Sequence, residues 1–391
     1  MPLEFLIAKH PINRINPDVL GLLTQAQKNT FARAFPNAHA LGIQVLDDLK
    51  LDVDLPDEWI DQPPTAISEL SFAELNKCYL ELLKSGAGIT GASAQLHAVN
   101  LSQRTQLVRA FEHPDAAIAK VTAKVTEIAA TLPRTAADIE RGRNPGDVLD
   151  PYILAATQTL LYGGGFQAAI GATVAHKALM MIEGLMGHLH EDVLGDMRGN
   201  VRAPEPRGFN QELLDPFENP FPGADVVQPP TGAGEKLRVH QVKSKTGTVK
   251  GGDGKRLGEQ LRKLEQYYDA DTFYDALIGN TLRGHRSIAG VRAASPNTVV
   301  TVGQAAFREL TRTNLGPELL LRVYQNAFME AAQATSYNVD TMVVQIFATF
   351  QERAEKAGEG FLEVVLHDAV GGEPKDQDSR FYVPPVRGKR T

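Results

Sequence analysis

The sequence contains very little cysteine: one residue, Cys78, in a chain of 391. A single cysteine excludes a disulfide within the chain and any zinc site built from several cysteines. Cys78 lies in an amphipathic helical stretch, where a buried structural thiol is much more common than a nucleophile.

Long hydrophobic runs are also missing. No apolar run approaches the ~18 residues of a membrane-spanning helix, and the start MPLEFLIAKHPINR lacks the basic beginning and long apolar centre of a signal peptide. We therefore expect no membrane contact and a cytoplasmic location. A hydrophobic content of 43% and a charged content of 22% are typical of a globular chain with one large domain or two.

Positive charge is in deficit, since the net charge is −7, and this argues against a protein that coats nucleic acid. The charge is distributed unevenly along the sequence. Residues 236–263 carry nine Lys or Arg and two acids, and residues 281–308 carry four Arg and no acid. A locally positive face on an acidic chain is typical of a protein that binds a polyanion on one side. The alternative is a solvated basic face without a partner.

The rest of the chain is organised around residues 225–259. Asp225 begins a short apolar run, and the two prolines and two glycines in residues 229–234 end that run in a turn. Residues 237–245 then alternate, with Gln241 and Lys243 on one face. If the two strands pair as a hairpin, the Asp225 carboxylate can approach both side chains. A carboxylate, an amide oxygen and an ammonium suit a hard divalent cation and a water beside a phosphate.

An acid followed about fifteen residues later by polar-x-Lys on the next strand resembles the PD-(D/E)XK nuclease superfamily. Ala224 replaces the leading Pro of that motif, and Gln241 replaces the usual Asp or Glu, a variant that the superfamily tolerates. The sequence from Lys243 through GGDGKRLGEQL to NTLRGHRS and NTVVTVG is similar to type II restriction endonucleases, the ApaLI-like ones among them. The resemblance covers residues 175–370.

The resemblance implies both a fold and an activity. The fold is α/β (α+β), with a mixed central β-sheet flanked by helices in a restriction-endonuclease-like core within residues 136–391. Helical periodicity predicts a mainly helical N-terminal region in residues 1–135. The activity is that of a type II restriction endonuclease, which makes sequence-specific, Mg2+-dependent double-strand cuts in DNA. A palindromic site would require a twofold homodimer, each subunit cutting one strand.

The resemblance also implies roles for individual residues. Asp225 would ligate Mg2+ directly, Gln241 would add its side-chain oxygen, and Val242 would add its carbonyl. Lys243 would orient the attacking water, help to lower its pKa and offset the charge that grows on the phosphate. Lys245 shares the strand face of Lys243 and competes for the same role.

Gln241 removes one negative charge from the motif, so another carboxylate is expected to compensate. Related nucleases often take it from the helix before the hairpin, where Glu183 and Glu191 lie, and Glu183 is the preferred candidate. Some take it from the helix after the catalytic strand, where Glu259 lies. A solvated helix-surface Glu is the alternative at each position.

DNA contacts are expected from basic and amide side chains, because Arg and Asn can bond the major-groove edges of G and A. The candidates are Lys245, Lys250, Lys255, Arg256, Asn280, Arg283, His285, Arg286 and Arg292. Three more arginines, Arg198, Arg202 and Arg207, lie in a Pro- and Gly-rich stretch and are candidates for phosphate contacts.

Local signals predict the remaining elements. Ser71 and Glu74 form a capping box before a helix. Residues 272–278 are predicted as a helix, and the β-branched run 298–302 is predicted as a central strand. Helices are predicted at 304–311, 317–334 and 339–356, with a final strand at 361–367.

Two other functions fit the same residues. One is a different nuclease on the same core, acting in repair, recombination or phage defence. The other is a non-catalytic, sequence-specific DNA-binding protein in which Gln241 marks a decayed site. Plasmid cleavage with Mg2+ or with EDTA separates these possibilities.

Overall fold

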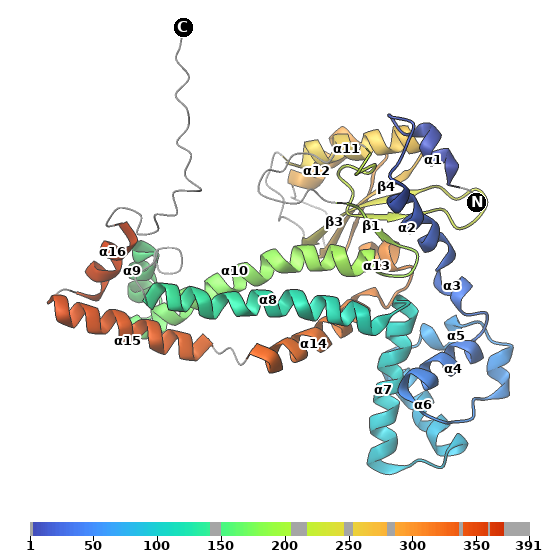
Figure 1. Ribbon diagram of the computed structural model, residues 1–391, viewed down its shortest axis with the longest axis horizontal. Coiled ribbons are helices and arrows are strands. Elements are labelled where there is room, and N and C mark those ends of the chain that lie inside the picture. The colour runs from blue at the N-terminus through green and yellow to red at the C-terminus, as the bar shows by residue number, and fades with distance from the viewer. Residues whose placement is uncertain are drawn as a thin grey trace, which may run out of the picture. The chain divides into compact units, whose positions relative to one another are not determined.

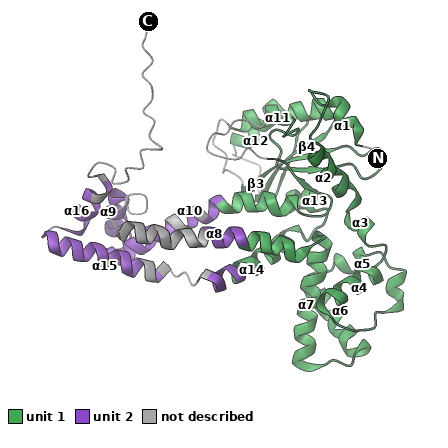
Figure 2. Ribbon diagram, in the orientation of Figure 1, with its two compact units in different colours: residues 1–122, 185–329 green, residues 123–184, 330–391 purple. Residues whose placement is uncertain are grey.

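A computed structural model describes residues 3–140, 150–204, 217–245, 253–279, 286–335, 339–358 and 360–370. The chain divides into two compact units, residues 1–122 with 185–329 and residues 123–184 with 330–391 (Figure 2). The predicted division at residue 135 falls inside helix α8 (Pro114–Glu140). Both α8 and α10 (Phe166–Gly195) contribute residues to each unit.

The first unit contains a five-stranded mixed sheet (Figure 1). In order across the sheet, the strands are β1 (Val201–Arg202), β2 (Val226–Gln228), β3 (Arg238–Lys245), β4 (Asp271–Ile278) and β5 (Val299–Val302). β1, β2 and β3 pair antiparallel, whereas β3, β4 and β5 pair parallel. The predicted mixed sheet flanked by helices is confirmed, and the described chain is mostly helical.

The β2–β3 hairpin that the sequence predicts is confirmed. Val226 pairs with His240 and Val227 with Val239. The Asp225 N–H donates to the His240 carbonyl at 2.8 Å, so Asp225 is tied to β3 just before β2 begins. The two prolines in the connection cannot donate to a ladder, and both strands end there.

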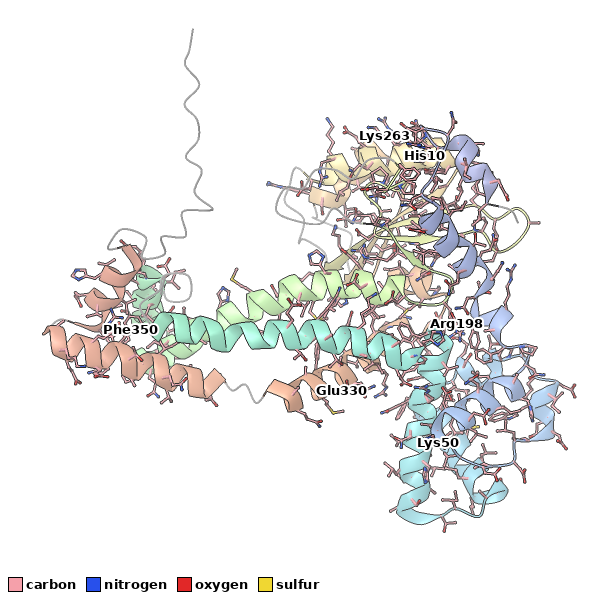
Figure 3. All side chains as sticks on the ribbon, viewed as in Figure 1. His10, Lys50, Arg198, Lys263, Glu330 and Phe350 are labelled. Carbon is pink, nitrogen blue, oxygen red and sulfur yellow. The ribbon has the colours of Figure 1, made fainter. Side chains whose placement is uncertain are left out.

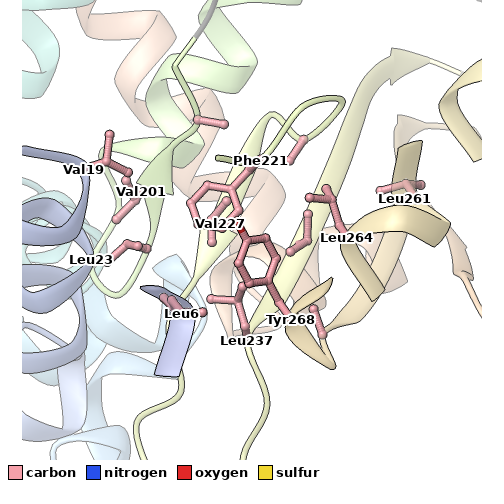
Figure 4. Close-up of a cluster of buried hydrophobic side chains, with 14 of the residues drawn as sticks. Leu6, Val19, Leu23, Val201, Phe221, Val227, Leu237, Leu261, Leu264 and Tyr268 are labelled. Carbon is pink, nitrogen blue, oxygen red and sulfur yellow. The ribbon is translucent and has the colours of Figure 1, made fainter. Parts of the chain in front are cut away.

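Helices cover both faces of the sheet (Figure 1). On one face lie α11 (Asp253–Tyr268) and α12 (Arg286–Ala294), whose Leu261 and Val291 share a core with Val239 and Tyr274 of the sheet. Figure 4 shows part of this core around Tyr268. Each large apolar side chain buried there stabilises the fold by about 1.5–3 kcal/mol.

The other face of the sheet is covered by α13 (Gln304–Thr311) and the C-terminal part of α10. A Cβ placed on Gly187 of α10 would lie 3.7 Å from the Ser244 hydroxyl of β3, so this part of the helix lies directly against the strand. A still closer approach joins α11 and α12. A Cβ on Gly254 would lie 2.3 Å from the Ser287 carbonyl oxygen, so only glycine permits this packing.

Two predicted elements have the wrong type. Residues 272–278, predicted as a helix, form β4, and the predicted strand at 361–367 lies in helix α16 (Phe361–Val370). β4 is buried on both faces, so its sequence DTFYDALI does not alternate between apolar and polar residues. In α16, Phe361, Val364 and Val365 are buried at the helical spacing i, i+3, i+4.

The first unit also holds most of the N-terminal helices. They are α1 (Glu4–Lys9), α2 (Pro17–Lys28), α3 (Phe31–Ala34), α4 (Ala38–Leu49), the 3-10 helix η1 (Asp57–Ile60), α5 (Thr65–Ser68), α6 (Phe72–Gly86) and α7 (Gly91–Ala110). The capping box at the start of α6 is present: Glu74 N–H donates to Ser71 Oγ, and Ser71 N–H donates to Glu74 Oε2. Cys78 packs against the core of these helices, and burial raises the pKa of its thiol.

All the regular elements described in the second unit are helices. It contains α9 (Pro151–Leu160), the first half of α10, α15 (Val339–Ala357) and α16, around a core that includes Leu154, Ile170 and Phe350. α14 (Gly316–Thr335) runs from the first unit into the second. None of the helices in the described ranges combines the length and apolar character that a bilayer crossing requires.

Candidate functional site

The candidate site lies where the residue before β2 meets the middle of β3. The Asp225 carboxylate accepts two hydrogen bonds on its Oδ2 atom, one from Gln241 Nε2 and one from the Val242 N–H at 2.7 Å. Asp225 and Gln241 are 9% and 3% exposed, so little water reaches this contact. The structure therefore brings together two of the predicted residues. Val242 meets the carboxylate through its N–H, whereas the sequence pointed to its carbonyl.

Lys243 lies two residues beyond Gln241 on the same face of β3, because side chains alternate along a strand. Two residues advance the strand by roughly 6.6 Å, a distance that a lysine side chain spans. Lys243 is half-buried, and Lys245, on the same face, is exposed. Both predicted ammonium groups thus follow the carboxylate–amide pair along one strand face.

Tyr274 is a neighbour of this pair that the sequence reasoning did not include. It lies beside Gln241 in the parallel β3–β4 register and is buried. Burial raises the pKa of its phenol, and the Asp225 charge raises it further, while a hydrogen bond with Ser287 opposes the shift. Tyr274 is therefore a neutral hydroxyl close to the Asp225 carboxylate.

Arg202 of β1 gathers three acidic side chains beside the site. Its Nη2 lies 2.6 Å from Glu191 Oε2, its Nε lies 3.3 Å from Asp192 Oδ1, and its Nη1 lies 3.9 Å from Asp225 Oδ1. The same Nη1 donates to the Asp225 carbonyl at 3.0 Å. Arg202, predicted as a phosphate contact, is thus held by carboxylates. Glu191, the less preferred of the two helix glutamates, contacts Arg202, and Arg202 in turn contacts Asp225.

These residues fit a hard divalent cation in their chemistry. Glu191, Asp192 and Asp225 bring three carboxylates around Arg202, and carboxylate and amide oxygens are the ligands that Mg2+ prefers. Gln241 presents its NH2 group to Asp225, so its amide would have to turn before its oxygen served as a ligand. Among the described residues, no group of three or more His, Cys, Asp or Glu side chains has the spacing of a ready-made metal cage.

The other two predicted carboxylates, Glu183 and Glu259, stand on helices α10 and α11. Glu183 is exposed on the part of α10 that belongs to the second unit. Glu259 is half-exposed on α11, and its Oε1 atom lies 3.9 Å from Lys255 Nζ in an i, i+4 ion pair. A surface pair of this kind contributes only about 0.3–0.5 kcal/mol.

The predicted DNA-binding residues that the structure describes lie largely on exposed helix surfaces. Lys255 and Arg256 are exposed on α11, and Arg286 and Arg292 are exposed on α12. Lys263, two turns farther along α11, is exposed on the side away from the sheet (Figure 3). Lys250, Asn280, Arg283 and His285, like Arg207, lie outside the described residues. We call Lys255, Arg256, Arg286 and Arg292, the described candidates on these two packed helices, the α11–α12 basic surface.

Arg198 has a structural role. Its Nε donates to the Val108 carbonyl at 3.1 Å, its Nη1 donates to Asn29 Oδ1, and its guanidinium lies over the Phe35 ring. Burial lowers the pKa of Arg198. These contacts tie the segment before β1 to the N-terminal helices.

A buried polar network crosses the opposite face of the sheet. His240 Nδ1 lies 2.8 Å from Asp275 Oδ2, Thr301 Oγ1 donates to the other Asp275 oxygen, and the His240 ring stacks on Phe273. Burial lowers the pKa of His240, while Asp275 opposes that shift. The network joins β3, β4 and β5 and so fixes the strand that carries Gln241 and Lys243.

No protein-family model matches this sequence, and no curated protein matches it at a significant level.

Proposed function

We propose that this chain is a Mg2+-dependent endonuclease that cuts double-stranded DNA at specific sequences, a type II restriction endonuclease on a restriction-endonuclease-like core. One observation carries the proposal. The Asp225 carboxylate is bonded to the side chain of Gln241 on the neighbouring strand, with Lys243 two residues farther along the same face.

Asp225 would hold the cation, with Glu191 as the additional carboxylate and the Gln241 amide oxygen as a neutral ligand. Arg202 connects Glu191 to Asp225, which supports this choice over Glu183 or Glu259. When bound, Mg2+ would supply a Lewis acid for the phosphate oxygens and lower the pKa of a water.

The remaining chemistry falls to residues of the chain itself. Lys243 orients the water that attacks phosphorus and stabilises the charge that develops on the phosphate oxygens. Tyr274 keeps a neutral hydroxyl near Asp225 and fills the space beside Gln241. Arg202 neutralises part of the carboxylate charge before a cation or DNA arrives.

DNA is the proposed polyanion because of the α11–α12 basic surface. Lys255 and Arg256 have side chains that are 77% and 61% exposed, so they can exchange their weak pairs with Glu259 and Asp253 for phosphates. Each phosphate neutralised by a Lys or Arg releases counterions and strengthens binding at low salt.

The test is digestion of supercoiled plasmid with Mg2+ and with EDTA, followed by mapping of the fragment ends. We expect discrete fragments with Mg2+ and intact plasmid with EDTA. Smears instead of discrete fragments would assign the chain to the less specific nucleases of repair or phage defence. Intact plasmid under both conditions would refute the nuclease proposal.

A second candidate is a non-catalytic, sequence-specific DNA-binding protein. The observation that favours it is the set of partners around Asp225: Gln241 Nε2 and the Val242 N–H satisfy one carboxylate oxygen without a metal, and Arg202 lies near the other. A specific gel shift without cleavage in Mg2+ would support this candidate.

A further inference from the structure

Helix α9 of the second unit has an outward-facing apolar stripe. Tyr152, Ala156 and Leu160 recur at i, i+4, i+8 and are all exposed, with Ile153 beside them. Leu161 and Tyr162, directly after the helix, are exposed as well. The inward side of the same helix is anchored by Leu154, which is fully buried against Ile170 and Phe350. The stripe therefore remains after the helix has buried its own core face, and we call these six residues the α9 patch.

The α9 patch is large for a surface that stays in water. Tyr152 is 70% exposed and Leu160 is 79% exposed, and the other three large side chains are 45–72% exposed. At about 150–200 Å² for a fully exposed large side chain, the patch presents roughly 500–600 Å² of apolar surface. That is comparable to the largest patch on a typical monomer and approaches the ~800 Å² that one partner contributes to a standard interface.

The charge of the segment that carries the patch favours one kind of partner. Asp150 caps the first turn of α9 by accepting from the N–H groups of Tyr152 and Ile153, and residues 151–176 contain no Asp, Glu, Lys or Arg. Helices that lie on membranes carry Lys and Arg on their polar face, and surfaces that bind nucleic acid need positive charge, so both partners are disfavoured. An uncharged apolar stripe can pair with an identical stripe without repulsion between like charges.

We infer that the α9 patch is the contact between two copies of this chain. Ala156, the small residue between Tyr152 and Leu160, lets a second α9 cross closely at the middle of the stripe, about 8–10 Å axis to axis. A twofold contact of this kind buries the same residues on both copies. The inference names the surface through which the proposed nuclease would dimerise, but it rests on the α9 patch and does not require nuclease activity.

The test is sedimentation velocity of the full-length chain over a range of concentrations, without DNA or Mg2+. Wild type is expected to be a dimer. Leu160→Asp is expected to raise the dimer dissociation constant by about 100-fold or more, because each copy then buries one unpaired carboxylate in the dimer contact. Leu96→Asp is the matched control: Leu96 is 61% exposed on α7 of the first unit, and this variant should dimerise like wild type. Circular dichroism confirms that each variant is folded.

Mixing two oppositely charged variants tests whether the contact can be restored. Leu160→Asp and Leu160→Lys chains should each be monomeric alone and should associate when mixed, because opposite charges then meet across the twofold axis. A wild-type monomer at every concentration, or a dimer unchanged by Leu160→Asp, would overturn the inference. So would a monomer that sediments with phosphatidylcholine vesicles, since the patch would then bind lipid.

Discussion

A Gln241→Glu substitution is expected to destabilise the metal-free protein and to make its stability depend on Mg2+. Gln241 and Asp225 are 3% and 9% exposed and share a hydrogen bond. The substitution removes a bond to a charged oxygen, worth about 1.5–3 kcal/mol. It also places two carboxylates about 4 Å apart, which costs about 4 kcal/mol at an effective dielectric constant of about 20.

The two costs do not add fully, because one carboxylate of the pair can bind a proton. We expect a loss of about 3–5 kcal/mol in unfolding free energy at pH 8 and a smaller loss at pH 5. The sign follows from linkage: repulsion raises the pKa of the pair in the folded protein, so the penalty is complete above that pKa and declines as the pH falls from it toward the pKa of the unfolded chain.

Mg2+ should offset much of this loss in the variant. A ligand at 100 times its Kd stabilises the folded state by about 2.7 kcal/mol. In a unit of about 250 residues, 1 kcal/mol corresponds to roughly 2–4 °C in Tm, so Mg2+ should raise the Tm of the variant by roughly 5–10 °C more than that of wild type.

The assay is thermal unfolding followed by circular dichroism in Mg2+ and in EDTA. Gln241→Met is the control, since it removes the same hydrogen bond without adding a charge. It should lose stability and gain no added response to Mg2+. If Mg2+ stabilises Gln241→Glu no more than Gln241→Met, the site does not hold a cation and the reasoning is refuted.

Three further predictions follow from the described contacts. Asp225→Asn should reduce cleavage by at least about 1,000-fold and abolish any stabilisation by Mg2+, because it removes the central charge; cleavage assays and Tm with and without Mg2+ check this. Replacing Lys255 and Arg256 together by Gln should reduce the slope of log affinity against log salt by about 2, measured by fluorescence anisotropy, whereas Lys356→Gln on α15 should leave it unchanged. Burial lowers the pKa of His190 to about 4, and its Nδ1 lies 2.7 Å from the Tyr324 hydroxyl. Protons therefore bind more readily to the unfolded chain, and unfolding free energy should fall by about 2 kcal/mol between pH 6.5 and pH 5. Urea titrations should show this fall in wild type and a smaller one in His190→Gln.

The parts of the site that were predictable depend on local signals. The prolines and glycines after Asp225 fix the turn, and the alternation in β3 puts Gln241 and Lys243 on one face. Those two features specify the hairpin and the Asp225–Gln241 contact without knowledge of the rest of the fold.

The parts that were not predictable depend on tertiary packing. β4 is buried on both faces, so its sequence lacks the period of two that predicts a strand, and neither the strand nor the place of Tyr274 could be foreseen. Glu183 and Glu191 share one face of a 30-residue helix. Periodicity does not show which turn of that helix meets the sheet. β1 has two residues in a Pro- and Gly-rich stretch, too short for any strand signal, so the ion pairs of Arg202 could not be foreseen.

The most direct test of the central claim compares Lys243→Ala with Lys245→Ala in one experiment. Both lysines lie on the same face of β3, but only Lys243 lies two residues from Gln241. Single-turnover cleavage with Mg2+ and DNA affinity with Ca2+ would be measured on the same DNA. The account predicts that Lys243→Ala binds within about threefold of wild type and cuts at least about 100-fold more slowly, while Lys245→Ala cuts nearly as fast as wild type. A Lys243→Ala variant that cuts at the wild-type rate would contradict the account.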